Sequence, residues 1–196
     1  MDMKDRHRKR CFDLFVSCFV LMLCFPALGI LILLCRFDTG QTGIFRQTRL
    51  GQNGKRFTLY KLRTMRSEAG SHVTTQNDSR ITKLGRVLRR YKLDELPQLW
   101  NVLKGDMSLV GPRPDLPGYL DQLKGPDRRL MTLRPGITGP ASLKYREEES
   151  LLASVDNPVA FNDIIIWPDK VRLNLAYLDN WSFVGDLKIL RQTILP

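Results

Sequence analysis

A stretch of 22 residues without a formal charge, from Leu14 to Cys35, constrains this chain more than any other feature. About 20 consecutive apolar residues suffice for a helix to cross a bilayer. A cleavable signal peptide is the first alternative, but its apolar region is shorter and ends at a site with small residues. Here the letters CRFDTG follow instead. The stretch therefore predicts a membrane helix.

Pro26 divides this stretch into apolar pieces of 12 and 9 residues, and an internal proline bends a helix. Both flanks are basic, with five Lys or Arg in residues 1–10 and Arg36 directly after the stretch. Basic flanks favour the cytoplasmic side of a membrane. A straight span would place one flank outside, whereas a helix that enters, bends at Pro26 and returns would keep both inside. From the residues alone, a bent span and a re-entrant helix remain equal alternatives.

The formal net charge of +11 over 196 residues predicts an anionic partner: nucleic acid, anionic lipid or a phosphorylated small molecule. Thirteen Lys or Arg fall within residues 46–92, against only Glu68 and Asp78. These cations form either a solvated basic face near anionic lipid or a group that binds phosphate, because a guanidinium offers paired donors. Both interpretations can hold at once.

All four cysteines lie in or beside the apolar stretch, and residues 36–196 contain none. This distribution fits neither a disulfide framework nor a CxxC zinc pattern, and it indicates a reducing compartment for the soluble part. The two histidines, His7 and His72, lie far apart in polar segments. We therefore expect both to be solvated, and we expect no His/Cys zinc site.

Local patterns predict a β-hairpin within residues 40–65, turning at the letters GQNGK, and a polar loop over residues 66–79. Two helices should follow. The first carries apolar side chains at helical spacing: Leu84, Val87, Leu88 and Tyr91. The second should start near Asp94, with Pro97 in its first turn and Gly105 as its stop. Its apolar stripe consists of Leu96, Leu99, Trp100 and Leu103.

Two segments rich in Gly and Pro, residues 105–118 and 133–140, are typical of loops. Residues 168–195 return to helical spacing. We expect seven of their side chains to face the core: Leu173, Ala176, Tyr177, Phe183, Leu187, Leu190 and Ile194. For Trp100, Trp167 and Trp181, core packing is favoured over anchoring at a membrane interface.

Asp94 and Glu95 are adjacent carboxylates in a strongly basic part of the chain. On local sequence alone the favoured role of Asp94 is a helix N-cap, with Glu95 a solvated residue of the first turn. The alternative is chemical. A carboxylate beside bound phosphate can attack phosphorus, provided that nearby cations such as Arg86, Arg89 or Arg113 neutralise the charge.

Five segments resemble the small, monotopic bacterial phosphoglycosyl transferases. They are KRCFDL (9–14), GIFRQTRLGQNGKRFTLYKLRTM (43–65), RITKLGRVLRRYKLDELPQLWNVLKGDMSLVGPRP (80–114), RPGITG (134–139) and LDNWSFVGDLKIL (178–190). The resemblance implies an enzyme that moves a sugar 1-phosphate from a UDP-sugar to undecaprenyl phosphate and releases UMP. It implies a ping-pong course with Mg²⁺, as the first membrane step of glycan assembly.

Carried to this sequence, the resemblance implies Asp94 as nucleophile and Glu95 as its partner, both near the metal. Arg113 in GPRP would contact phosphate. Further phosphate or nucleotide candidates are Lys61, Arg63, Arg89, Arg90, Arg134 and Arg146. Pro26 matches the break of a re-entrant membrane helix, which favours that topology over a bent span.

The implied fold is a helix-dominated α/β domain, residues 37–196, behind a basic tail and re-entrant helix, residues 1–36. Amphipathic helices would lie along the cytoplasmic face of the bacterial inner membrane. Membrane lipid is then a partner, nucleic acid is not, and a homodimer is compatible with the resemblance. We expect the chain to match the minimal form of the family, without a multi-span region before the domain. Two features depart from the family pattern: Phe25 replaces a common Ser before the proline, and PASLKYREEES follows GITG.

Overall fold

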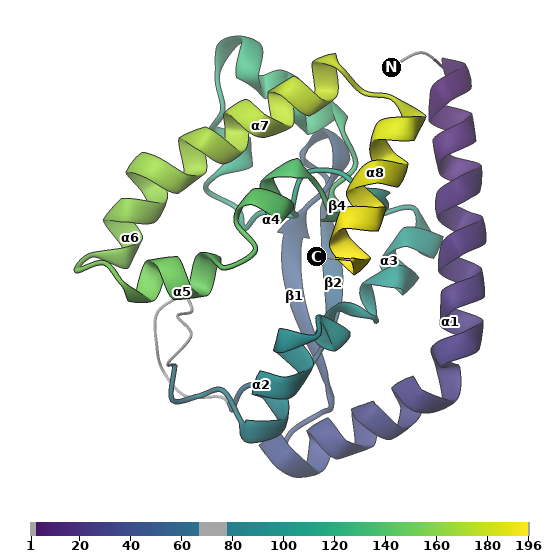
Figure 1. Ribbon diagram of the computed structural model, residues 1–196, viewed down its shortest axis with the longest axis vertical. Coiled ribbons are helices and arrows are strands. Elements are labelled where there is room, and N and C mark those ends of the chain that lie inside the picture. The colour runs from purple at the N-terminus through teal and green to yellow at the C-terminus, as the bar shows by residue number, and fades with distance from the viewer. Residues whose placement is uncertain (1–2, 67–77, 196) are drawn as a thin grey trace.

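The computed structural model describes residues 3–66 and 78–195 of the chain. Helices dominate, as Figure 1 shows, and the described part holds two sheets of two strands each. This confirms the predicted helix-dominated α/β class. Most of the polar loop predicted over residues 66–79, including His72, lies outside the described residues. In chain order the helices and strands are α1 (Met3–Thr39), β1 (Ile44–Leu50), β2 (Arg56–Leu62), α2 (Lys83–Arg90), α3 (Gln98–Lys104), β3 (Ser108–Val110), β4 (Gly136–Thr138), α4 (Pro140–Lys144), α5 (Glu148–Ala153), α6 (Pro158–Phe161), α7 (Trp167–Asp179) and α8 (Phe183–Ile194).

Helix α1 contains the whole apolar stretch and continues through Pro26. Figure 1 shows it bent into two arms, as an internal proline requires. One face packs on the protein, where Phe12 and Val16 join the cluster around Leu99, and Cys35 joins Leu62. The opposite face exposes large apolar side chains: Phe15, Phe19, Met22, Leu23, Phe25, Ile30, Leu33, Leu34 and Phe37. Within the described residues, α1 is the one helix long and apolar enough to cross a membrane.

Polar contacts attach the first turns of α1 to the rest of the molecule. The Lys9 ammonium lies 2.5 Å from an oxygen of Asp186, at the start of α8. Arg10 donates to the backbone carbonyls of Val102 and Leu103, at 2.7 and 3.1 Å. These carbonyls belong to the C-terminal turn of α3, where a cation is favourable. The basic end of α1 therefore docks on protein. Exposed His7 in the same tail confirms the prediction for that residue.

The predicted hairpin is confirmed. Strands β1 and β2 pair antiparallel from Ile44 opposite Leu62 to Leu50 opposite Arg56. Asn53 and Gly54 form the turn with positive φ angles of 56° and 75°, which Asn and Gly tolerate best. Asn101 of α3 fastens this hairpin: its amide donates to the Thr58 carbonyl at 2.7 Å and accepts from the Tyr60 N–H at 3.1 Å.

Each of the two predicted loops, residues 105–118 and 133–140, contains a short strand, β3 or β4. The loop prediction was therefore wrong for these strand residues. Strands β3 and β4 pair in parallel, Ser108 with Gly136 and Val110 with Thr138. A Cβ added to Gly136 would lie 2.1 Å from the Gly111 nitrogen. The glycines therefore allow two backbones to approach too closely for any side chain. From local sequence, such glycines are expected to form turns. Only the close approach of Gly111 and Gly136, 25 residues apart in the chain, shows that they serve the pairing of β3 with β4.

Several burial predictions were also wrong. Val87, Tyr91 and Trp100 are 51%, 65% and 54% exposed, because α2 and α3 each bury only a narrow face. Residues 168–195 form two helices, because Ser182 caps a new helix by accepting from the Gly185 N–H at 3.0 Å. Three residues predicted to face the core are exposed: Ala176, Leu187 and Ile194. Core packing is confirmed for Trp167 and in part for Trp181, whose indole donates to Asp186 at 3.1 Å.

Candidate active site

Asp94 and Glu95 lie in a turn of 3-10 helix, Leu93–Glu95, between α2 and α3. Lys92 precedes the turn with a φ of 56°, a left-handed conformation that is uncommon for lysine and ends α2. Helix α3 begins at Gln98 rather than near Asp94, because the chain first makes i→i+3 bonds and then passes through Pro97. Gly105 ends α3 with a φ of 90°, as predicted.

Asp94 does not cap a helix, so the capping interpretation is wrong. The residue is 7% exposed, and its Oδ1 atom is buried without a hydrogen-bond partner. Burial raises the pKa of Asp94, and the charge of Glu95 adds to this, while Lys61, Arg89 and Lys92 oppose it. A buried oxygen without a partner costs free energy. Such an atom is expected where a ligand supplies the missing contact.

Glu95, unlike Asp94, has two cationic hydrogen-bond partners. Its Oε1 accepts from the Lys61 ammonium at 2.8 Å and from the Arg113 guanidinium at 3.3 Å. Burial by itself would raise the pKa of Glu95, but the charges of Lys61 and Arg113 outweigh it and lower this pKa. Glu95 therefore stays ionised and in place. In return, its charge raises the pKa of Arg113.

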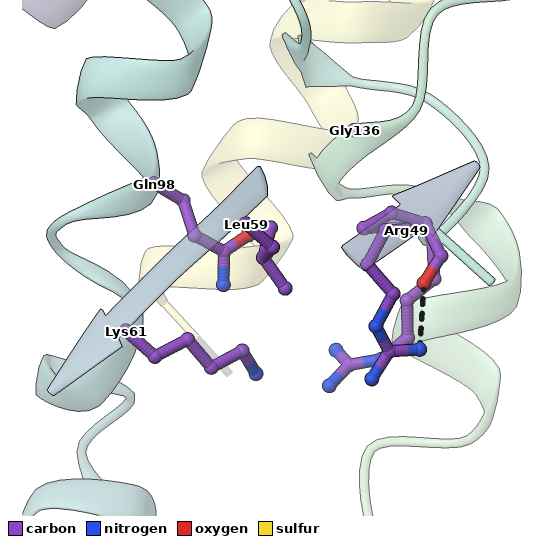
Figure 2. Close-up of a pocket in the computed structure, with 7 residues that line it drawn as sticks. Arg49, Leu59, Lys61, Gln98 and Gly136 are labelled. Carbon is purple, nitrogen blue, oxygen red and sulfur yellow. Dashed lines mark hydrogen bonds between the residues drawn. The ribbon is translucent and has the colours of Figure 1, made fainter. Parts of the chain in front are cut away.

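A hollow is lined by Lys61 and Arg113, the two cations that hold Glu95, and Lys61 and Arg49 point into it from the two strands of the hairpin (Figure 2). Its lining residues are Arg49, Leu59, Lys61, Gln98, Arg113, Pro114 and Gly136. Three of the seven are cationic. A small space into which three cations converge suits a phosphate group.

Arg113 reaches the hollow through the pairing of β3 and β4. The Gly111 N–H donates to the Thr138 carbonyl at 2.9 Å, and the Gly136 N–H donates to the Pro112 carbonyl at 2.7 Å. The GPRP and RPGITG segments, which lie apart in the sequence, are thereby joined backbone to backbone. Arg113 follows directly from this rigid pairing, although its own side chain is 46% exposed.

The structure brings four of the predicted site residues together: Asp94, Glu95, Lys61 and Arg113. Arg89 lies close enough to act on the pKa of Asp94. Its guanidinium is ion-paired with Glu149 of α5, in the segment that departs from the family pattern. Arg89 therefore lies near the site, and its guanidinium is engaged by the Glu149 carboxylate.

The other predicted cations are placed elsewhere. Arg63 donates to the Thr42 carbonyl at 2.7 Å and stacks over Phe45. Arg90 is exposed beside Tyr91. The remaining two are placed near helix ends: Arg134 lies near Arg10 of α1, and Arg146 donates to the Gln192 carbonyl of α8 at 2.7 Å. A role for these four in binding substrate stays a prediction.

Sequence reasoning missed Arg49, Gln98 and Asp115. Arg49 and Gln98 line the hollow. Burial raises the pKa of Asp115 to about 7, against the pull of Lys170 and Arg49. The period of two along a strand is the signal that was available for Arg49. It separates Arg49 from Arg46 and puts it on the same face of the hairpin as Lys61, once the register is known.

No group of three His, Cys, Asp or Glu side chains that could hold a metal ion occurs among residues 3–66 and 78–195. Asp94 and Glu95 supply at most two carboxylates to a metal, and one oxygen of Glu95 already accepts from Lys61 and Arg113. The unpartnered Oδ1 of Asp94 is the atom best suited as a ligand.

A family model described as bacterial sugar transferase matches residues 4–196. An uncharacterized sugar transferase of Bacillus subtilis, EpsL, is 42% identical over 95% of this chain and 85% of its own length. The exopolysaccharide production protein PSS of Rhizobium leguminosarum bv. phaseoli is 36% identical over 95% of this chain and 93% of its own length. The UDP-glucose:undecaprenyl-phosphate glucose-1-phosphate transferase of Escherichia coli is 36% identical over 97% of this chain, which spans 40% of that protein.

Proposed function

The chain belongs to the bacterial sugar transferases and is a phosphoglycosyl transferase, and from this premise we propose that it moves a sugar 1-phosphate from a UDP-sugar to undecaprenyl phosphate. UMP is the second product. The observation that carries the proposal is the buried Oδ1 of Asp94, which has no partner and lies beside a Glu95 held by two cations. The E. coli relative is named for a reaction of this class.

In the first step an Asp94 oxygen attacks the phosphorus that bears the sugar. A bond from that oxygen to phosphorus forms, and the bond from phosphorus to the bridging oxygen breaks. The electron pair leaves with UMP. In the second step an oxygen of undecaprenyl phosphate attacks the same phosphorus, which breaks the bond to Asp94 and restores the carboxylate. No proton transfer is required, so the pair needs no general base.

The cations around the site supply electrostatic stabilisation. Lys61 and Arg113 are held by Glu95 at 2.8 and 3.3 Å, so they are oriented before substrate arrives. Glu95 acts as the anchor of these cations. Mg²⁺ is proposed as the cofactor, because it commonly takes one or two carboxylates and completes its shell with water and phosphate oxygens. Asp94 would hold it, with Glu95 as the second candidate, and the bound ion would neutralise diphosphate charge.

The experiment that tests the proposal uses the purified full chain with Mg²⁺ and a panel of UDP-sugars. With donor alone, the enzyme should release up to one UMP per active site, and peptide mapping should find a phospho-sugar on Asp94. Addition of undecaprenyl phosphate should discharge the adduct. UMP release that requires both substrates together, with no adduct at any time, would refute the two-step course.

A further part of the proposal concerns α1, which we place as a re-entrant helix in the inner membrane with the catalytic residues on the cytoplasmic face. The docked basic end of α1 and its exposed apolar face support this placement. Lys4→Cys and Gln41→Cys, each in a background without the native cysteines, should react with an impermeant thiol reagent from the same side. Labelling from opposite sides would identify α1 as an ordinary bent span.

A further inference from the structure

Arg49 is the least expected cation of the hollow, because only the strand assignment and the hairpin register separate it from the exposed Arg46 on the same strand. The hairpin register places Arg49, Gln47 and Lys61 on one face. Figure 2 shows the Arg49 guanidinium and the Lys61 ammonium entering the hollow from different strands. Arg113 completes the group of three cations.

The guanidinium of Arg49 is held in one orientation. Its Nε and one terminal nitrogen donate to the Gln47 amide oxygen at 3.1 and 2.6 Å. The other terminal nitrogen donates to the Pro114 carbonyl at 3.1 Å. A guanidinium has five N–H groups, so one on each terminal nitrogen remains for a ligand. A cation fixed by neighbours and left with two donors suits bidentate recognition of phosphate.

The hollow has an excess of positive charge. Glu95 makes its ion pairs with Lys61 and Arg113 and acts on Arg49 only more weakly, while Asp115, whose pKa burial raises to about 7, supplies Arg49 with less than a full negative charge at neutral pH. Burial, and then the charge of Arg113, lowers the pKa of Arg49 to about 10, which leaves it protonated at neutral pH. Three cations held together in a partly buried space repel one another, and an anion would relieve this cost.

The surroundings of Arg49 differ from those of Asp94. Lys61, Arg89 and Lys92 lower the pKa of Asp94, and Asp94 in turn raises the pKa of Arg113, whereas Arg49 responds to Arg113, Asp115 and Glu95 but not to Asp94 among its main causes. Lys61 and Arg113 lie between Asp94 and Arg49, because both interact with Asp94 and both line the hollow with Arg49. The site thus has two adjacent places for phosphate, one at Asp94 and one at Arg49.

Building on the proposed function, we propose that Arg49, with Lys61 and Arg113, binds the phosphate that is not transferred. In the first step this is the phosphate that leaves in UMP. In the second step the phosphate of the lipid acceptor, which is also a monoester dianion, would enter the vacated place. Arg49 is therefore a binding residue for the group that departs and for the group that replaces it.

The test compares Arg49→Gln and Arg49→Lys with wild type, and Arg46→Gln serves as the matched control from the exposed face of the strand. UMP binding is measured by calorimetry, and the Michaelis constants for donor and acceptor are measured separately. Arg49→Gln should weaken UMP binding and raise the donor KM by about 10- to 100-fold. Arg49→Lys keeps the charge but loses the fork, so a smaller loss is expected. Arg46→Gln should match wild type.

The arms of the test separate the sources of phosphate. A rise in the donor KM and in the UMP dissociation constant assigns the place to the nucleotide, and a rise in the acceptor KM assigns it also to the lipid phosphate. If Arg49→Gln lowers only the melting temperature, with both KM values and UMP binding unchanged, Arg49 is structural and the inference is overturned. If Arg49→Gln does not fold, Arg49→Lys decides by the same measurements. Failure of wild type to release UMP would refute the proposed function instead.

Discussion

Asp13 in α1 and Ser108 in β3, 95 residues apart in the chain, share a buried hydrogen bond of 2.8 Å. The second Asp13 oxygen accepts from the Leu109 N–H at 3.2 Å, and the residue is 2% exposed. A carboxylate directly before the apolar stretch is thus buried inside the protein. It connects α1 to the strand that leads into Arg113. The position of α1 and the geometry of the segment that carries Arg113 are therefore linked.

Asp13→Ala should destabilise the protein by about 1–3 kcal/mol, because it leaves the buried Leu109 N–H without an acceptor. Thermal unfolding in detergent measures this loss. Cys11→Ala, at an exposed position of the same helix, is the control and should leave stability unchanged. An Asp13→Ala protein as stable as wild type would mean that the link between α1 and β3 contributes nothing.

Asp94→Asn should reduce UMP release at least about 1,000-fold, because an amide does not replace a carboxylate nucleophile. Its stability should not fall, since the change removes a buried charge whose Oδ1 lacks a partner. The raised pKa of Asp94 also means that wild-type activity should decline on acidification earlier than for an exposed aspartate. Asp156→Asn, at an exposed site, is the matched control. Substantial turnover in Asp94→Asn would remove Asp94 as nucleophile.

Lys61→Met should destabilise the fold by about 3 kcal/mol, because it leaves the buried Glu95 charge with Arg113 alone. Adding Glu95→Gln should restore part of this loss, and a double-mutant cycle from denaturant unfolding measures the coupling. The pair Lys104–Asp106, in which the lysine is exposed and the aspartate half-buried, provides the comparison, and Lys104→Met should cost less than about 1 kcal/mol. Additive effects of the two changes at Lys61 and Glu95 would contradict the ion pair.

Asp115→Asn should change how stability depends on pH. Burial raises the pKa of Asp115 from its ordinary 3.8 to about 7, so the folded state keeps a proton that the unfolded state has released between these values. Wild-type stability therefore falls as the pH rises through this window. The melting temperature of Asp115→Asn relative to wild type should rise from about pH 4 to pH 7 and then level off. Parallel curves for the two proteins would show that Asp115 titrates normally.

Gly136→Ala should cost about 3 kcal/mol and most of the activity, because the new Cβ would lie 2.1 Å from the Gly111 nitrogen and 2.6 Å from the Thr138 carbonyl. Neither backbone atom can move without displacing the loop that carries Arg113. Gly29→Ala in α1 is the control, since no atom lies within 4 Å of its Cβ. Activity and melting temperature measure both effects. A neutral Gly136→Ala would show that the pairing of β3 and β4 is dispensable.

Local patterns predicted those features whose physics is local. The long apolar helix, the hairpin at Asn53 and Gly54, and the stop at Gly105 each depend on neighbouring residues alone. Predictions from short-range patterns were wrong where packing against another element decides which side chains are buried. Trp100 has a core-like side chain and helical spacing, yet it is 54% exposed, because the packing of α3 against α1 and β2 determines which face is buried.

The candidate site also combines features that local sequence predicts with features that depend on tertiary packing. The sequence by itself determined which chemical groups the chain carries and their local order: two adjacent carboxylates, a basic segment and the GPRP motif. Only the tertiary structure decided that Asp94 keeps a buried oxygen without a partner while Glu95 is held by Lys61 and Arg113. The physical reason is that burial and ion pairing depend on groups from other parts of the chain, 34 residues away for Lys61 and 18 for Arg113, which local sequence does not specify.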